Sequence, residues 1–199
     1  IPGWQGRFIC LDQTDISPAG STNIEPCDLY SVQADGDAKC GHRASLYHIK
    51  ISTRSSHLSH LFNQGVNSIE LIELEETSRA KMQQLVVDRL GGNDQATYLA
   101  PFENFDFRVV FGIISHKDPA GLSDNLPLFS KISLMRNMQR LDVMRVPCAL
   151  AFIPDESPAK GGPKAVKDTA AGTRYRMVVK VADDGSLTTH FGWPYELAA

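Results

Sequence analysis

Two short groups of residues carry the side chains best suited to chemistry. Glu25 and Asp28 lie in the run Glu-Pro-Cys-Asp, and Lys50 ends the run His-Ile-Lys that begins at His48. Carboxylate oxygens are the ligands that Mg²⁺ prefers, and a nearby lysine can orient an attacking water or stabilise charge developing on phosphorus. If neighbouring strands bring the two groups together, they form a metal-assisted hydrolytic site. The alternative is that Lys50 is a surface residue and Asp28 a solvated strand end.

A second set of polar residues follows directly after Lys50. Arg54, Ser55 and Ser56 stand where a helix is predicted to begin, so free amides, hydroxyls and a guanidinium can meet a phosphate there. His60 and Gln64 continue along the same helix. We therefore predict that these five residues bind phosphate or nucleic acid. The competing interpretation is ordinary helix capping by serine, with His57 and His60 as solvated histidines rather than a zinc pair.

The elements that must position these residues can be read from the hydrophobic period. Alternation predicts strands, and apolar residues three and four apart predict helices. Gly65 is predicted to end the first helix in a left-handed conformation, and Phe129, Ile132, Met135, Met138 and Leu141 are predicted to face the core. The predicted elements are strands at 7–12, 24–32, 46–51, 105–115 and 149–153, helices at 56–64, 68–90 and 127–143, and a terminal hairpin of 174–181 with 187–191.

Composition limits the class of protein. With 199 residues, 42% of them hydrophobic and 22% charged, the chain can form one sizeable core. The formal charge of −3 gives no overall basic field, so contact with nucleic acid must use a local patch. No apolar run is long enough to span a membrane, and the spacing of the four cysteines favours reduced thiols, which leads us to expect a cytoplasmic protein. A first residue other than Met suggests a fragment or a processed chain.

Several motifs resemble a sporadically distributed family of uncharacterised bacterial proteins. The family motifs have the forms E-x-C-D-L-L, I-H-V-K, S-S-x-L-S-H-L-F-x-Q-G and L-P-F-F-S-K. Their counterparts here begin at Ile24, Tyr47, Ser55 and Leu126, and the resemblance spans about Arg7 to Ile153. Members of that family are longer, so this chain resembles their C-terminal part. The family has no settled activity, and the resemblance implies kinship more than function.

A more distant similarity is to the PD-(D/E)XK nuclease superfamily, whose core runs α-β-β-β-α-β with an acid on the second strand and (D/E)-x-K on the third. It implies a mixed α/β, restriction-endonuclease-like domain over 1–153, followed by a linker or exposed loop at 154–172 and a hairpin appendage at 173–199. Asp28 would match the first acid and Lys50 the lysine, whereas His48 replaces the usual acid. Neutral imidazole is a poorer Mg²⁺ ligand than carboxylate.

The expectation that follows is a Mg²⁺-dependent nuclease acting in bacterial defence or mobile-element conflict. Asp28 and Glu25 hold the metal, and Asp28, His48 and Lys50 are the catalytic residues, His48 serving as a ligand or proton carrier. The alternative is a non-catalytic module that binds nucleic acid or a partner protein with the same residues. No membrane is involved in either case, and the oligomeric state is left open.

Overall fold

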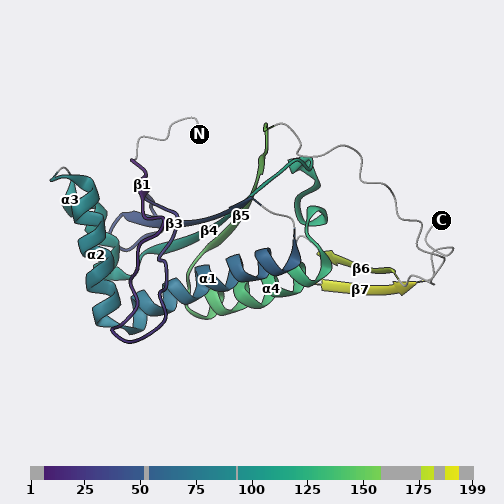
Figure 1. Ribbon diagram of the computed structural model, residues 1–199, viewed down its shortest axis with the longest axis horizontal. Coiled ribbons are helices and arrows are strands. Elements are labelled where there is room, and N and C mark those ends of the chain that lie inside the picture. Colours follow the sequence, from purple (N-terminus) through teal and green to yellow (C-terminus); the bar gives the residue numbers. More distant parts are fainter. Residues whose placement is uncertain (1–6, 52–53, 93, 158–175, 182–186, 193–199) are drawn as a thin grey trace. The chain divides into compact units, whose positions relative to one another are not determined.

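The computed structural model describes residues 7–51, 54–92, 94–157, 176–181 and 187–192 (Figure 1). Contacts divide the chain into two compact units, Ile1–Glu156 and Ser157–Ala199. The first unit is an α/β domain whose elements are β1 (Ile9–Cys10), β2 (Leu29–Ala34), β3 (His42–Ile51), α1 (Ser55–Leu74), α2 (Glu76–Leu90), α3 (Gln95–Asn104), β4 (Phe107–Ser115), the 3-10 helix η1 (Pro119–Asn125), α4 (Leu128–Val143) and β5 (Cys148–Pro154). None of its described helices is long and apolar enough to cross a bilayer.

One mixed five-stranded sheet, in the order β1-β2-β3-β4-β5, organises this unit. β2 is antiparallel to both β1 and β3, while β4 is parallel to β3 and β5. This confirms the predicted succession of three neighbouring strands and the central position of β4. The second predicted strand is too early, because β2 begins at Leu29 and leaves Glu25 and Asp28 in the segment before it. Pro26 in that segment has no N–H to give to a ladder.

The sheet has one covered face. Alternate residues of the three middle strands are fully or almost fully buried beneath the helices, as period-two alternation requires: Tyr30, Val32, Ala44, Leu46, His48, Phe107, Val109, Phe111 and Ile113. On the other face Ser31 and Ser45 are buried, whereas Tyr47, Ile49 and Val110 are only half-buried. Phe8 packs edge-on against Tyr47, with ring centroids 5.4 Å apart.

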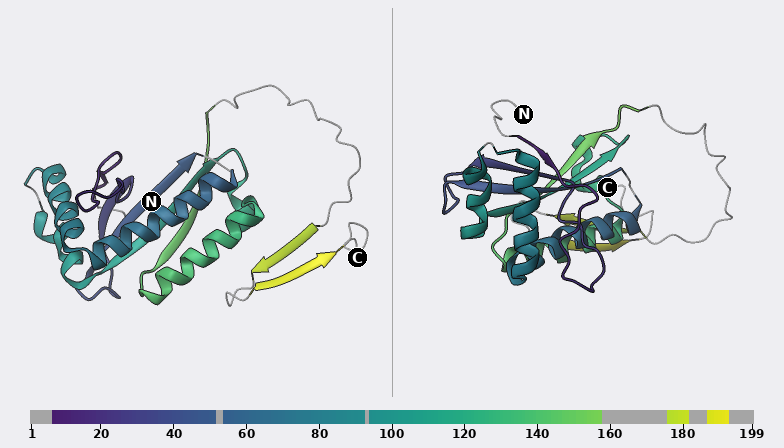
Figure 2. Two further views of the ribbon diagram at one scale, coloured as in Figure 1. Left: turned by 60° about the horizontal axis from the view of Figure 1, so that its bottom comes forward. Right: turned by 60° about the vertical axis from the view of Figure 1, so that its left-hand side comes forward.

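Helix α1 lies across the covered face, alongside β3 and β4 (Figures 1 and 2). It runs through Gly65, where we predicted its end. A Cβ on Gly65 would stand 2.6 Å from the Phe111 ring and 3.1 Å from Val109, so this glycine serves close packing of helix on sheet rather than a left-handed cap. The helix ends instead at Leu74, because Glu75 has extended backbone angles and α2 starts after it.

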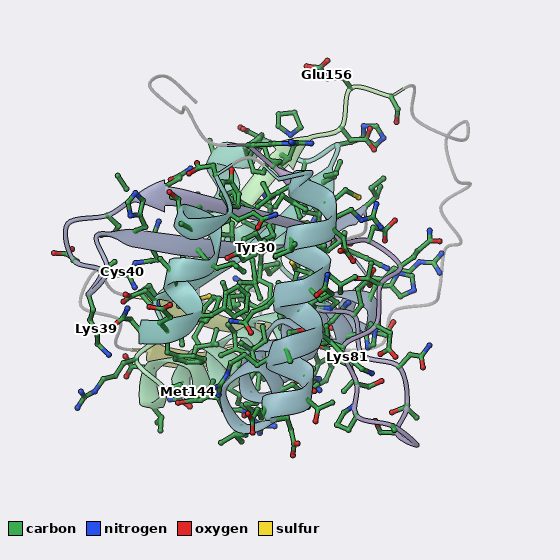
Figure 3. The ribbon with its side chains drawn as sticks, turned by 90° about the vertical axis from the view of Figure 1, so that its left-hand side faces the viewer. Tyr30, Lys39, Cys40, Lys81, Met144 and Glu156 are labelled. Atoms are coloured by element: carbon green, nitrogen blue, oxygen red, sulfur yellow. The ribbon has the colours of Figure 1, made fainter. Side chains whose placement is uncertain are left out.

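Helices α2 and α3 cover the antiparallel half of the sheet. Tyr30 lies at their centre, and its hydroxyl donates to the Tyr98 carbonyl of α3 at 2.7 Å (Figure 3). The ring of Phe102 packs on those of Tyr30 and Phe107. Helix α3 was missed in the sequence because Pro101, within it, is a strong helix-breaking signal.

Helix α4 packs beside α1, but with a different face from the one predicted. Its buried residues are Ser130, Leu134, Asn137 and Leu141. Of the predicted core residues only Leu141 is buried; Phe129 is 73% exposed and Met138 43% exposed. The reason is a polar seam between the two helices. Ser55 pairs with Ser130 at 3.1 Å, Asn63 with Asn137 at 3.1 Å and Glu70 with Arg140 at 2.7 Å.

The second unit contains the predicted hairpin. Strand β6 (Arg176–Val181) pairs antiparallel with β7 (Leu187–Gly192). Most of the predicted linker at 154–172 lies outside the described residues.

Candidate functional site

Three carboxylates converge beside the start of β2. Asp12, Glu25 and Asp28 each present an oxygen atom, and these atoms lie within 4.8 Å of one another. The predicted pair, Glu25 and Asp28, is therefore brought together as expected. Asp12 was not predicted, because it stands in what looks like a turn and is distant in sequence. We call these residues the acid group.

A folded loop between β1 and β2 brings Asp12 back to the other two. The Asp15 carboxylate accepts hydrogen bonds from the Ser17 amide at 2.9 Å and the Ile24 amide at 3.0 Å, which closes the loop on itself. The Leu11 amide donates to the Asp28 carbonyl at 2.9 Å. From α2, the Lys81 ammonium donates to the Ser17 carbonyl at 2.6 Å, and Figure 3 shows Lys81 beside this loop. Hydrogen bonds within the loop, and one from Lys81, thus hold the acid group in place.

Glu25 is fixed from both sides. One carboxylate oxygen accepts from the Gln13 amide at 2.5 Å, and the other accepts from the Gln64 side chain at 3.0 Å. One turn further along α1, the Ser68 hydroxyl donates to the Glu25 carbonyl at 3.0 Å. Gln64, predicted to contact phosphate, instead orients a carboxylate of the acid group.

Asp28 links the acid group to β3. Its amide donates to the Tyr47 carbonyl at 2.9 Å, and its carboxylate accepts from the Ile49 amide at 2.5 Å. The strands that follow Asp28 and contain Lys50 are adjacent and antiparallel, as predicted. Lys50 is exposed near the end of β3, and its charge acts on the Asp28 carboxyl.

The electrostatics of the acid group call for a positive charge. Burial raises the pKa of Glu25, and the neighbouring Asp28 raises it further; burial and Asp12 likewise raise the pKa of Asp28. In the described part of the chain no lysine or arginine nitrogen lies within 4.0 Å of these three carboxylates. Carboxylates this close repel one another unless a proton or a cation lies between them. A set of ligands made only of oxygen suits a hard cation such as Mg²⁺.

His48 is separate from the acid group. Its side chain is fully buried beneath α1, beside the Phe111 ring at a centroid distance of 6.1 Å. Neither ring nitrogen has a hydrogen-bond partner, and burial lowers the pKa of His48 to about 3. The strand alternation that puts Leu46 in the core also puts His48 there. It is a neutral core residue at neutral pH, which argues against the expected role as ligand or proton carrier.

The residues predicted to contact phosphate have different positions in the structure. Arg54 is the N-cap of α1 and is exposed, and its side chain makes no capping hydrogen bond. Ser55 and Ser56 lie within the first turn, so the capping interpretation is wrong. Ser55 pairs with Ser130 of α4, whereas Ser56 and His60 are exposed on α1.

Comparison with known proteins places this architecture in a family. A family model described as "Family of unknown function (DUF6119)" matches residues 4–154. The chain belongs to this family. The match ends at the last residue of β5, so DUF6119 includes the whole sheet, its helices and the acid group. No curated protein and no solved structure matches the chain.

Proposed function

We propose that this DUF6119 domain is a metal-dependent, nuclease-like domain that acts on the phosphodiester backbone of nucleic acid. The observation that carries the proposal is the acid group beside the exposed Lys50 at the end of β3. Among the described residues these carboxylates form no ion pair within 4.0 Å, and together with the nearby Lys50 they form a combination suited to binding a divalent cation and a phosphate.

The acid group fits Mg²⁺ by the chemistry of its ligands. Asp12 and Asp28 would hold the ion, with Glu25 completing the set. When bound, Mg²⁺ would offset the charge of a phosphate and polarise it toward attack by water.

The side chains of the site would then have separate roles in hydrolysis of the phosphodiester. Lys50 would place positive charge beside the oxygens of the phosphate, where negative charge develops as water attacks. The proton that the attacking water loses would pass to solvent. The P–O bond opposite the attacking water breaks, and its oxygen leaves as part of the second fragment of the nucleic-acid strand. Arg54, the N-cap residue of α1, and His60, within that helix, are exposed and would contact neighbouring phosphates.

The arrangement of elements supports the same proposal. Three strands are followed by α1 and later by a parallel strand, which is the order expected from a PD-(D/E)XK-like core. The acid lies at the entrance to the second strand and the lysine on the third. His48 occupies the position of the second acid, and Asp12 and Glu25 would supply the carboxylates that His48 does not.

One observation favours a second candidate, a module that binds nucleic acid without cutting it. The imidazole of His48 is fully buried at the position where a nuclease of this type has a metal-binding acid. The binding candidate retains Lys50, Arg54 and His60 as phosphate contacts, but assigns no hydrolysis to the acid group.

A cleavage assay with matched variants tests the proposal. Single- and double-stranded DNA and RNA are incubated with the full chain in Mg²⁺, Mn²⁺ or chelator. We expect Mg²⁺-dependent cleavage, reduced on the order of a hundredfold or more in Lys50→Ala and Asp28→Asn. Lys39→Ala and Asp37→Asn, exposed at the turn between β2 and β3, are the controls and should retain activity.

The outcomes separate the two candidates. Loss of cleavage with retained binding in chelator supports the nuclease. Salt-dependent binding that Arg54→Ala weakens, with no cleavage at any metal concentration, supports the binding module. If the wild type neither binds Mg²⁺ in calorimetry nor binds or cuts any of these nucleic acids, both candidates are wrong.

A further inference from the structure

Strand β5 is an open edge of the sheet. Among the described residues its strand partner is β4 alone. Two bonds fix which of its backbone groups point inward: the Val109 amide donates to the Pro147 carbonyl at 3.0 Å, and the Asp155 amide donates to the Ser115 carbonyl at 2.9 Å. Since parallel ladders use every second residue, the odd-numbered residues bond β4. The amides and carbonyls of Cys148, Leu150 and Phe152 therefore point away from the sheet.

This edge lacks the usual protection against pairing. Edge strands are normally shielded by charged side chains, bulges or short length. The sequence of β5 is Cys-Ala-Leu-Ala-Phe-Ile-Pro, seven residues with no charge, and only Pro154 at its end lacks an N–H. Leu150 and Phe152, on the helix side, are only partly buried. The described residues thus leave both the backbone and the side chains of β5 incompletely covered.

Helix α4 also exposes apolar side chains, and we call β5 together with the outward side of α4 the border. It connects β4 to β5, and it lies beside α1, which packs on β3 and β4 (Figure 2). Its polar and small residues face α1, as described above. At 100° per residue, Phe129, Ile132, Met135 and Val143 lie on the other side of the helix, with the exposed Arg136 and Gln139 among them. Phe129 is 73% exposed and Val143 84% exposed.

We propose that this border binds a second copy of the chain, with the two β5 strands antiparallel across a two-fold axis. The strand is self-complementary in this arrangement. With Ala151 opposite Ala151 of the copy, Leu150 faces Phe152 and Ala149 faces Ile153, so every residue of β5 has a partner. The outward amides and carbonyls of Leu150 and Phe152 then bond in pairs.

The two-fold axis that pairs the β5 strands also relates the two copies of α4. Because α4 connects the parallel strands β4 and β5 and packs on α1, it lies on the covered face of the sheet, and the operation that pairs the strands would bring the α4 helices toward each other in an antiparallel arrangement. A partner that offered only a strand would leave Phe129 and Val143 exposed. A second copy covers the open strand and the open helix in one contact.

Charge favours the antiparallel copy as well. Arg145 precedes β5 and Glu156 follows it, and both are exposed. Antiparallel pairing brings the basic end of one strand to the acidic end of the other. A parallel arrangement would put like charges together at each end.

The first test is the mass of the full chain in solution. Sedimentation equilibrium should give twice the chain mass, in a concentration-dependent manner. Ala151→Lys should weaken the dimer at least tenfold, because the two lysines would face each other, and Phe129→Glu with Val143→Glu should do the same. Ala34→Lys, at an exposed position of β2, and Leu74→Glu, at a residue 76% exposed, are the matched controls and should leave the dimer unchanged.

The second test locates the contact. Ala151→Cys should form a disulfide between two chains on oxidation, because facing residues of a non-hydrogen-bonded pair have the spacing that a disulfide needs. Mass spectrometry of the peptides identifies the bridge and distinguishes it from bridges of the native cysteines. Hydrogen exchange at the amides of Leu150 and Phe152 should slow as protein concentration rises.

Three results would overturn the proposal. A chain that stays monomeric at about 100 µM, well above the Kd of a specific dimer, is one. A dimer that both sets of border variants leave intact is another, since it uses a different surface. Protection of the Leu150 and Phe152 amides that does not depend on concentration is the third, because it would show that another segment of the same chain covers β5.

Discussion

At the scale of single residues, the acid group is the feature with the clearest energetic consequence. Glu25 and Asp28 hold fixed hydrogen bonds from Gln64 and the Ile49 amide, yet the pKa of each carboxyl is raised, because burial and the neighbouring acids outweigh those bonds. The folded chain thus binds protons at the acid group more readily than the unfolded chain does. A site built for stability alone would have the opposite property.

We predict that Asp28→Asn becomes more stable relative to the wild type as pH rises. The pKa of an aspartate in an unfolded chain is about 3.9. Since its pKa is raised in the folded chain, the folded state binds more protons between the two values, and the free energy of unfolding of the wild type falls as pH rises through that window. Asparagine keeps an oxygen for the Ile49 amide but has no charge. Urea unfolding from pH 3 to 7 in chelator measures the difference.

Asp35 provides a control of opposite sign. Hydrogen bonds from Arg43 and the Asp37 amide lower the pKa of Asp35, so its contribution to stability is present above the unfolded pKa and is lost as pH falls through the folded pKa. Asp35→Asn should therefore be less stable than the wild type at pH 7. If both variants shift in the same direction, the electrostatic account of the acid group is wrong.

At the scale of elements, the approach of α1 to the sheet decides where the site residues stand. Gln64 and Ser68 reach Glu25 because the next residue after Gln64 is a glycine that lies against Phe111. A larger residue at Gly65 would push the helix away from β4, and with it the side chains that orient Glu25. Close packing of this helix and geometry of the acid group are therefore coupled.

We predict that Gly65→Ala destabilises the domain although alanine favours helices. The added Cβ would stand 2.6 Å from Phe111. Overpacking of this kind costs about 1 to 3 kcal/mol, against a gain of about 1 kcal/mol in helix propensity, so a net loss of up to about 2 kcal/mol is expected. Chemical denaturation measures it.

Two further variants show whether the cause is steric. Phe111→Leu combined with Gly65→Ala should lose less stability than the sum of the single changes, because the smaller side chain makes room for the methyl group. Gly36→Ala has no atom within 4 Å of its new Cβ and should change stability by less than about 0.5 kcal/mol. Additive losses would indicate that contact with Phe111 is not the cause.

At the scale of the whole molecule, the chain divides where the family match ends. The first compact unit closes at Glu156, and the DUF6119 match closes at residue 154. The sheet, the covering helices and the acid group all belong to that unit.

We predict that a chain ending at Glu156 folds cooperatively by itself. Its core of buried side chains, from Ile9 to Val146, lies within the first unit. Its melting temperature should fall within about 4 °C of that of the full chain, which corresponds to about 1 kcal/mol for a domain of this size. Calorimetry on both chains measures this. A truncated chain that fails to unfold cooperatively would show that the last 43 residues belong to the same folding unit.

Local sequence determined much of the architecture. Alternation and apolar content identified β3, β4 and β5, and the turn at Asp35-Gly36-Asp37 indicated that β2 and β3 pair antiparallel, because both signals depend on residues close in the chain. The same reasoning put Glu25, Asp28 and Lys50 near one another. Element limits were less accurate where side chains compete with the ladder, as before Leu29.

Only the tertiary structure decided the remainder. Asp12 joins the acid group through a loop held by Asp15 and Lys81, contacts between residues far apart that no local period records. His48 was assigned to chemistry by its motif, but the sheet face it shares with Leu46 places it in the core. The face of α4 that meets α1 is set by polar pairs such as Asn63 with Asn137, so its apolar side is left outward. In each case the deciding interaction joins distant segments, and a pattern within one segment cannot contain it.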